Sequence, residues 1–210
     1  MRIDIWLGMS LLFAALGANA TTIASDFSTD LDGWTVSAGS GALSHMASGG
    51  NPGGFLFVDN AEGAVVVRAI APAKFLGDLS AFDGGFLSFD GNLLTKGSVP
   101  FYSPYGQVRI STSSGTPATL DLAPSDPTVG VWTSYGVALD AATWGQTPAR
   151  WAQILSDVTE IAIVLEGVSG FETNGFDNFA ITSVPEPSRV ALALIAGLVL
   201  WIARRAARGG

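Results

Sequence analysis

The chain has 210 residues, one histidine, no cysteine and a formal net charge of −8 at pH 7. This composition excludes disulfides, thiol nucleophiles and Cys-ligated zinc, and it argues against His-rich metal sites. Residues 21–183 carry five basic and sixteen acidic side chains, so their net charge of −11 would repel a nucleic-acid backbone but suits divalent cations.

The first twenty residues have the pattern of a secretory signal peptide. Arg2 provides a basic start, residues 5–16 are mainly apolar, and Ala18-Asn19-Ala20 is a small-x-small cleavage site. The sequence therefore predicts export and cleavage by signal peptidase after Ala20.

Residues 21–183 have the pattern of one antiparallel β domain. Short apolar runs recur between clusters of Gly, Pro, Asn, Asp and Ser, and two of them alternate clearly between apolar and polar residues. The first run follows a Gly-rich turn over residues 48–54. The expected strands cover residues 55–59, 64–70, 85–91, 107–113, 118–122, 131–139, 160–165 and 176–183.

One helix is expected within this domain. Pro148 suits a first helical turn, and Trp151, Ile154 and Leu155 follow at helical spacing. We expect a short helix over residues 149–155 that closes one end of a sandwich. With eight to ten strands and neither an internal repeat nor a βαβ rhythm, the predicted fold is an all-β jelly-roll sandwich.

The C-terminal residues 184–210 form a second targeting segment. Val184-Pro185-Glu186-Pro187-Ser188 precedes an apolar run over residues 190–203 and a basic end over residues 204–210. As a helix the run is about 21 Å long at 1.5 Å per residue, short of the ~30 Å hydrocarbon core. Extending it to residues 188–203, with arginines snorkelling, predicts a transmembrane helix whose basic end stays in the cytoplasm.

This order of motif, apolar helix and basic end resembles the PEP-CTERM sorting signal of exported Gram-negative proteins. The resemblance implies an inner-membrane intermediate that an exosortase cleaves near Pro185, Glu186 and Pro187, with only transient contact with the membrane. It also implies a final location at the cell surface or outside the cell, in a biofilm-forming lifestyle.

Three stretches of the domain form a recognisable set. They are Asp26-Phe27 with Leu31-Asp32-Gly33-Trp34, Gly49-Gly50-Asn51-Pro52-Gly53-Gly54-Phe55, and Gly175-Phe176-Asp177-Asn178-Phe179. On these stretches the domain resembles the laminin B (domain IV) family and its galactose-binding-like relatives. Laminin-type domains are structural or adhesive, so the resemblance implies a module without catalytic residues.

The closing Gly-Phe-Asp-Asn-Phe pattern also resembles jelly-roll carbohydrate-binding modules, in which acids of the first and last strands hold a structural calcium. Asp26 and Asp177 match those positions, and Asp59 could add an oxygen ligand of the kind calcium prefers. The alternative is that Asp26 caps a turn and Asp177 binds backbone N–H groups.

Four aromatic residues are candidate sugar-stacking positions: Trp144, Tyr102, Tyr105 and Trp132. Trp144 and both tyrosines lie in expected loops, where ligand contacts concentrate. A core position is the alternative for Trp132, as it is for Trp151. The unique histidine, His45, is expected to be a packing or hydrogen-bonding residue.

The sequence therefore favours an exported, non-catalytic module that is structural or adhesive and binds extracellular polysaccharide, with calcium as a structural ion. The competing class is a glycan hydrolase, which would need two carboxylates about 5–10 Å apart. A third possibility is a purely structural exterior protein with no small ligand.

Overall fold

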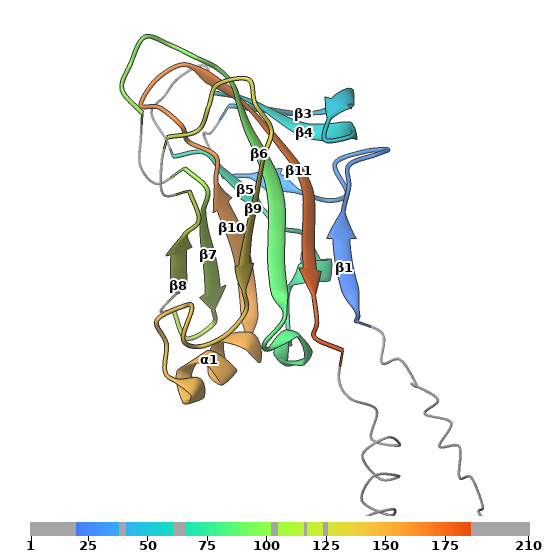
Figure 1. The fold of residues 1–210 in the computed structure, drawn as a ribbon, viewed down its shortest axis with the longest axis vertical. Helices are drawn as coiled ribbons and strands as arrows, with labels where there is room; N and C mark the ends of the chain where they lie inside the picture. The colour runs from blue at the N-terminus through green and yellow to red at the C-terminus, as the bar shows by residue number, and fades with distance from the viewer. Residues whose placement is uncertain are drawn as a thin grey trace, which may run out of the picture. The chain divides into compact units, whose positions relative to one another are not determined.

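Two antiparallel sheets pack face to face (Figure 1). The computed structural model describes residues 20–37, 41–60, 66–101, 105–115, 117–123 and 126–185. The folded unit runs over Thr21–Val184. The predicted signal peptide, the predicted membrane helix and most of the Pro-Glu-Pro motif lie outside the described residues. Within the described part of the chain, no helix is long and apolar enough to cross a membrane.

The first sheet has six strands and the second has five, and all pairings are antiparallel. The first sheet has the order β3 (Ala42–Gly50), β4 (Gly53–Asn60), β11 (Glu172–Thr182), β6 (Phe86–Lys96), β9 (Thr133–Ala138), with β1 (Thr22–Ser25) also paired to β11. The second has the order β2 (Thr35–Val36), β5 (Arg68–Ile70), β10 (Val158–Val164), β7 (Gln107–Thr112), β8 (Ala118–Asp121).

Helix α1 (Pro148–Leu155) closes the lower end of the sandwich in Figure 1, as the sequence predicted. The side chain of Thr147 caps it by accepting the N–H of Arg150. Trp151 and its apolar neighbours on one face of the helix are buried against the sheets. Two short 3₁₀ helices, Ala73–Phe75 and Ser80–Phe82, complete the structure of the described residues.

The core is organised around Trp34, of which 2 % is exposed. Its ring lies 4.9 Å from Phe179 and 5.0 Å from Phe176, at inclined angles. The indole N–H donates to the hydroxyl of Ser25 at 2.9 Å, so the polar atom of this buried ring is satisfied. The Gly33-Trp34 pair of the sequence therefore contributes to the core.

Each of the eight expected strands corresponds to an observed one, but three strands have too little signal to be found. Strands β1 and β2 are only four and two residues long. Strand β3 consists mainly of small and polar residues, and its two large apolar residues, Leu43 and Met46, are three positions apart and do not alternate. The turn expected over residues 48–54 is shorter in the structure. Residues 48–50 belong to β3 and residues 53–54 to β4, and these two strands pair as a hairpin.

Trp34→Ala should lower the free energy of unfolding by about 3–5 kcal/mol, because it removes the largest ring of a closely packed cluster. Urea titration of the full chain in detergent measures this as a lower midpoint. Phe171→Ala is the matched control: Phe171 is 50 % exposed, so its loss should cost about 0.5 kcal/mol or less. Equal losses in the two variants would contradict the assignment.

Candidate functional site

The outer face of the six-stranded sheet carries an unusual set of polar and aromatic side chains. Strand β11 alternates, with Phe176 in the core while Gly175 and Asp177 point outward. The outward neighbours across the sheet follow from the strand register. They are Phe55, Phe57 and Asp59 on β4, Asp90, Asn92 and Thr95 on β6, Thr173 on β11, and Ser134 on β9.

Trp132 lies across this face. Its ring centroid is 5.4 Å from that of Phe55 at an interplanar angle of 82°, and its indole N–H donates to the carbonyl of Gly49 at 3.0 Å. The ring also covers Gly175, where a Cβ atom would fall 2.7 Å from the indole Cη2. Trp132 therefore connects the start of β9 to β11 and to the β3–β4 hairpin, and part of it remains exposed.

A second cluster lies where two strands meet on the same edge of β11. Strand β4 pairs with β11 up to Phe176, and β1 pairs with it from Phe179. In the gap between them, Asp177 faces the Asn51 backbone. Its Oδ2 accepts the N–H of Asn51 at 2.7 Å, and its Oδ1 accepts the N–H of Asn178 at 2.8 Å.

Asp90 on β6 completes this cluster, which we call the Asp177 corner: Asn51, Asp90, Asp177 and Asn178. The Oδ2 of Asp90 accepts the amide groups of Asn178 at 2.7 Å and of Asn51 at 3.2 Å. The Asn178 amide also donates to the carbonyl of Asn51. A Cβ at Gly50 would fall 2.6 Å from Asp177 Oδ2, so the hairpin can approach the carboxylate only with glycine there.

Burial raises the pKa of Asp177, and the charges of Asp90 and Asp26 raise it further against its hydrogen bonds. The pKa of Asp26 is instead lowered, chiefly by the backbone N–H of Ser28, which donates to its carboxylate at 3.0 Å. Asp26 is exposed and caps a turn, yet its charge reaches Asp177. The two acids expected to lie near each other therefore interact electrostatically.

The predicted third ligand, Asp59, lies elsewhere on this face. It pairs with Thr173, four residues along β11 from Asp177, which is about 13 Å at ~3.3 Å per residue. Among the described residues, no three Asp, Glu or His side chains are grouped closely enough to hold a metal ion. Calcium at the Asp177 corner would thus take most of its oxygens from amides, carbonyls and water.

Two of the predicted ligand-stacking residues are buried and cannot contact a ligand in this structure. Trp144 is 3 % exposed, stacks on Trp151 at 5.4 Å and donates its indole N–H to Ala138 O at 2.9 Å. Tyr105 is also 3 % exposed and lies between the sheets. Their loops fold back over the core, which position in the sequence could not reveal. Tyr102 lies outside the described residues.

The sequence did not reveal the partners of Asp177. Asp90 lies 87 residues earlier in the chain and meets Asp177 only through strand pairing. The sequence shows alternation around Phe89, but it carries no signal for the strand that lies beside Asp90. His45 has the role expected of it, since its Nε2 is 2.7 Å from the carbonyl of Phe27.

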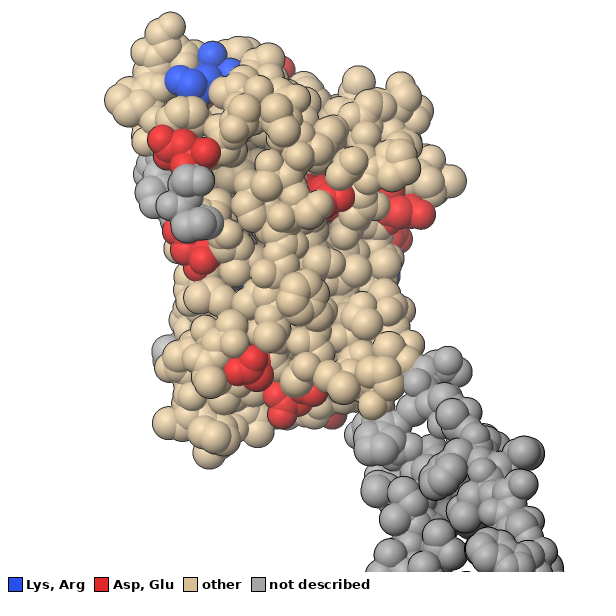
Figure 2. Space-filling view, in the orientation of Figure 1, with Lys and Arg blue, Asp and Glu red and all other residues tan. Residues whose placement is uncertain are grey.

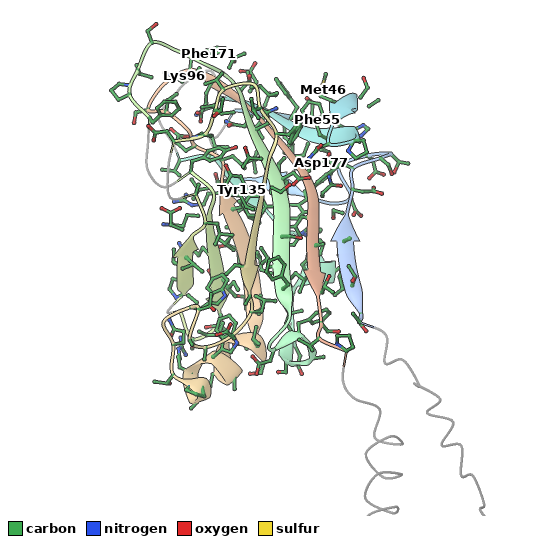
Figure 3. All side chains as sticks on the ribbon, in the orientation of Figure 1. Met46, Phe55, Lys96, Tyr135, Phe171 and Asp177 are labelled. Atoms are coloured by element: carbon green, nitrogen blue, oxygen red, sulfur yellow. The ribbon has the colours of Figure 1, made fainter. Side chains whose placement is uncertain are left out.

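The overall charge of the module is visible on its surface. In the view of Figure 2, acidic side chains are spread over the molecule, and lysine or arginine appears only near the upper end. Figure 3 shows Asp177 on β11 below Phe55 and Met46 of the β3–β4 hairpin.

No protein-family model matches this chain, and no curated protein matches it. Solved structures do match. An exo-β-agarase superposes with a TM-score of 0.54 at 17 % identity, covering 77 % of this chain and 24 % of that one. The CBM22-1 xylan-binding domain of Paenibacillus barcinonensis Xyn10C superposes with a TM-score of 0.50 at 11 % identity, covering 76 % of this chain and 92 % of that domain.

The chain has a jelly-roll fold similar to that of the xylan-binding domain. It spans about a quarter of the agarase, so the likeness concerns one module of that enzyme. The L4b domain of human laminin alpha-2 is also similar, at a lower TM-score of 0.46 and 13 % identity, covering 56 % of this chain and 70 % of that one.

Gly175→Ala should destabilise the chain by about 1–3 kcal/mol, because the new methyl group overlaps Trp132. The same change in a Trp132→Ala background should cost much less, and urea titrations of the four proteins measure the difference. Gly97→Ala is the control, since its Cβ would meet only one backbone oxygen, at 3.5 Å. A cost for Gly175→Ala that is independent of Trp132 would contradict the packing described.

Proposed function

We propose that this protein is an exported, non-catalytic module that binds extracellular polysaccharide on the outer face of its six-stranded sheet. The observation that carries the proposal is the combination on one face of a partly exposed indole, Trp132, with a row of carboxylate, amide and hydroxyl groups. Sugars present apolar ring faces and hydroxyl groups together, so such a surface matches both. The jelly-roll fold supports the proposal because the similar xylan-binding domain has the same architecture.

Hydroxyl groups on this face lie where a ligand can reach them. Thr95 is exposed and Thr173 is half-buried, and their hydroxyls lie 2.7 Å apart. Each hydroxyl can donate one hydrogen bond and accept others, so the pair keeps capacity for a sugar hydroxyl.

The geometry of the acidic residues favours binding over hydrolysis. At the Asp177 corner, amide or backbone N–H groups donate to both oxygens of Asp177 and to Oδ2 of Asp90. Asp177 is 0 % exposed, so its carboxyl group is not placed to exchange a proton with a substrate, as a general acid or base must. A glycan hydrolase that uses this pair is the competing function, and the assay below distinguishes it.

Calcium and the sorting route belong to the same proposal. The donor set of the Asp177 corner, with two carboxylates and the carbonyl of Asn51, consists of the hard oxygens that calcium prefers. Bound there, the ion would link the β3–β4 hairpin to β11.

Residues 184–210 would direct the chain to the inner membrane, where exosortase cleavage would release the module to the cell surface or exterior.

Trp132→Ala should weaken polysaccharide binding by tenfold or more, about 1.4 kcal/mol. Affinity electrophoresis of the full chain in detergent against xylan and agarose measures this. Phe171→Ala is the matched control, because Phe171 is a 50 %-exposed aromatic that precedes β11 and lies outside the strands of this face. Binding to neither polysaccharide, or equal effects of the two variants, would contradict the proposal. Release of reducing sugar that Asp177→Asn abolishes would establish the hydrolase.

Chelation should lower the thermal midpoint of the full chain. A ligand at a hundred times its Kd stabilises the folded state by about 2.7 kcal/mol, and EDTA removes that contribution. Asp177→Asn should reduce the shift between calcium and EDTA, while the exposed control Asp121→Asn should keep it. An identical midpoint with calcium and with EDTA would remove calcium from the proposal.

A further inference from the structure

A second polar cluster lies inside the sandwich, near the start of β11. Glu166 and Glu172 are 3 % and 0 % exposed; burial raises the pKa of Glu172, and the charge of Glu166 raises it further. Asn174, also 0 % exposed, lies two residues from Glu172 on the inner face of β11. Two buried carboxylates in one interior are costly unless an opposite charge or a metal ion compensates them.

One oxygen of each carboxylate is fixed by N–H donors. The Oε2 of Glu172 accepts the backbone N–H groups of Gly167 at 2.8 Å and Val168 at 2.9 Å. The Oε2 of Glu166 accepts the N–H of Val67 at 3.1 Å and the amide of Asn60 at 3.2 Å. Hydrogen bonds to one oxygen of a carboxylate also fix the direction of its second oxygen. In metal sites, hydrogen bonds to the ligating side chains orient the ligands in the same way.

The remaining polar atoms of the cluster have no partner within the described residues. These atoms are Glu172 Oε1, both side-chain atoms of Asn174 and the hydroxyl of Tyr105, all of them buried. Burial raises the pKa of the Tyr105 phenol. The charge of the Glu172 carboxylate raises it further, because the two groups are close. Three oxygens from three side chains are therefore left unsatisfied around one buried charge.

The neighbouring basic side chains do not neutralise Glu172. Lys96 is opposite Glu172 in the strand register, but its Nζ donates to the carbonyls of Gly97 and Val99 and lies 4.8 Å from the ring centroid of Phe101. Burial raises the pKa of Glu166, and the charge of Arg68 offsets this only in part. Burial raises the pKa of Glu172 to about 7, the mark of a charge without a counter-charge.

We propose that this interior cluster binds a calcium ion through Glu172 Oε1, Asn174 Oδ1, the Tyr105 hydroxyl and the carboxylate of Glu166. The ligands are all hard oxygens, and the two glutamates match the charge of a divalent cation. Water fills the remaining positions of the coordination shell. This site is distinct from the Asp177 corner, because Glu172 lies five residues away along β11, about 17 Å at ~3.3 Å per residue, and on the opposite face of the sheet.

The bound ion would link three segments: the β10–β11 connection at Glu166, strand β11 at Glu172 and Asn174, and the segment before β7 at Tyr105. Its effect is therefore on the stability of the upper end of the sandwich. Because the site faces the interior, it does not depend on whether the outer face binds polysaccharide.

Isothermal titration of the chelator-treated full chain in detergent with calcium tests the proposal. The wild type should bind two equivalents, and Glu172→Gln and Asp177→Asn should each lose a different one. Asn174→Ala should weaken calcium binding at the interior site about tenfold, or 1.4 kcal/mol, and leave binding at the Asp177 corner unchanged.

Terbium serves as a luminescent probe for calcium sites. Its luminescence should be sensitised by Tyr105, so Tyr105→Phe should reduce it while Asp177→Asn should not.

Equal stoichiometry in the wild type and in Glu172→Gln would overturn the proposal, as would terbium luminescence unaffected by Tyr105→Phe. If Glu172→Gln does not fold, the Asn174→Ala titration and the Tyr105→Phe luminescence decide alone. A different outcome is that Glu172→Gln raises stability above pH 7 relative to the wild type without changing the dependence of stability on calcium. That result would show that Glu166 and Glu172 share a proton and do not bind an ion. Loss of one equivalent in Glu172→Gln but none in Asp177→Asn would reject only calcium at the Asp177 corner.

Discussion

Strand β11 forms backbone hydrogen bonds with three other strands, and both polar clusters described above lie along it. Its eleven residues extend beyond any one partner on the β1–β4 edge, so β4 pairs with its first half and β1 with its second. The junction at Asp177 and Asn178 is left without a partner strand on that edge. Side chains and the β3–β4 hairpin satisfy the backbone there, which concentrates polar groups at one point of the sheet.

The alternation of β11 assigns different chemistry to its two faces. Inward residues Phe176 and Phe179 pack on Trp34 and hold the sheets together, whereas outward residues Gly175 and Asp177 meet Trp132 and Asp90. The inner face itself changes along the strand, from aromatic near Phe176 to polar at Glu172. A single strand thus supplies the core, the candidate ligand face and the buried carboxylate.

The outer face also shows why aromatic residues in expected loops are poor guides to ligand sites. Trp144 and Tyr105 lie in connecting segments, yet both are buried, because each loop folds over an open end or edge of the sandwich. Burial of a ring removes a large apolar area from water, about 25 cal/mol per Å², so a ring that can reach the core is stabilised there. Trp132 remains partly exposed because it lies outside the sheet, over Gly175, where no second layer covers it.

Local patterns in the sequence are enough for the class of fold and much of the core. Apolar runs between turn residues predicted eight of the strands and the closing helix, because these are local patterns of burial. The export and sorting motifs are local as well, and they stay predictions. The acids that meet can be read only from the folded chain: Asp177 lies with Asp90 rather than Asp59, and Glu166 with Glu172 inside the sandwich. Such pairs form between strands that are distant in the chain, and the order of strands in a sheet is set by global packing, which no local pattern records.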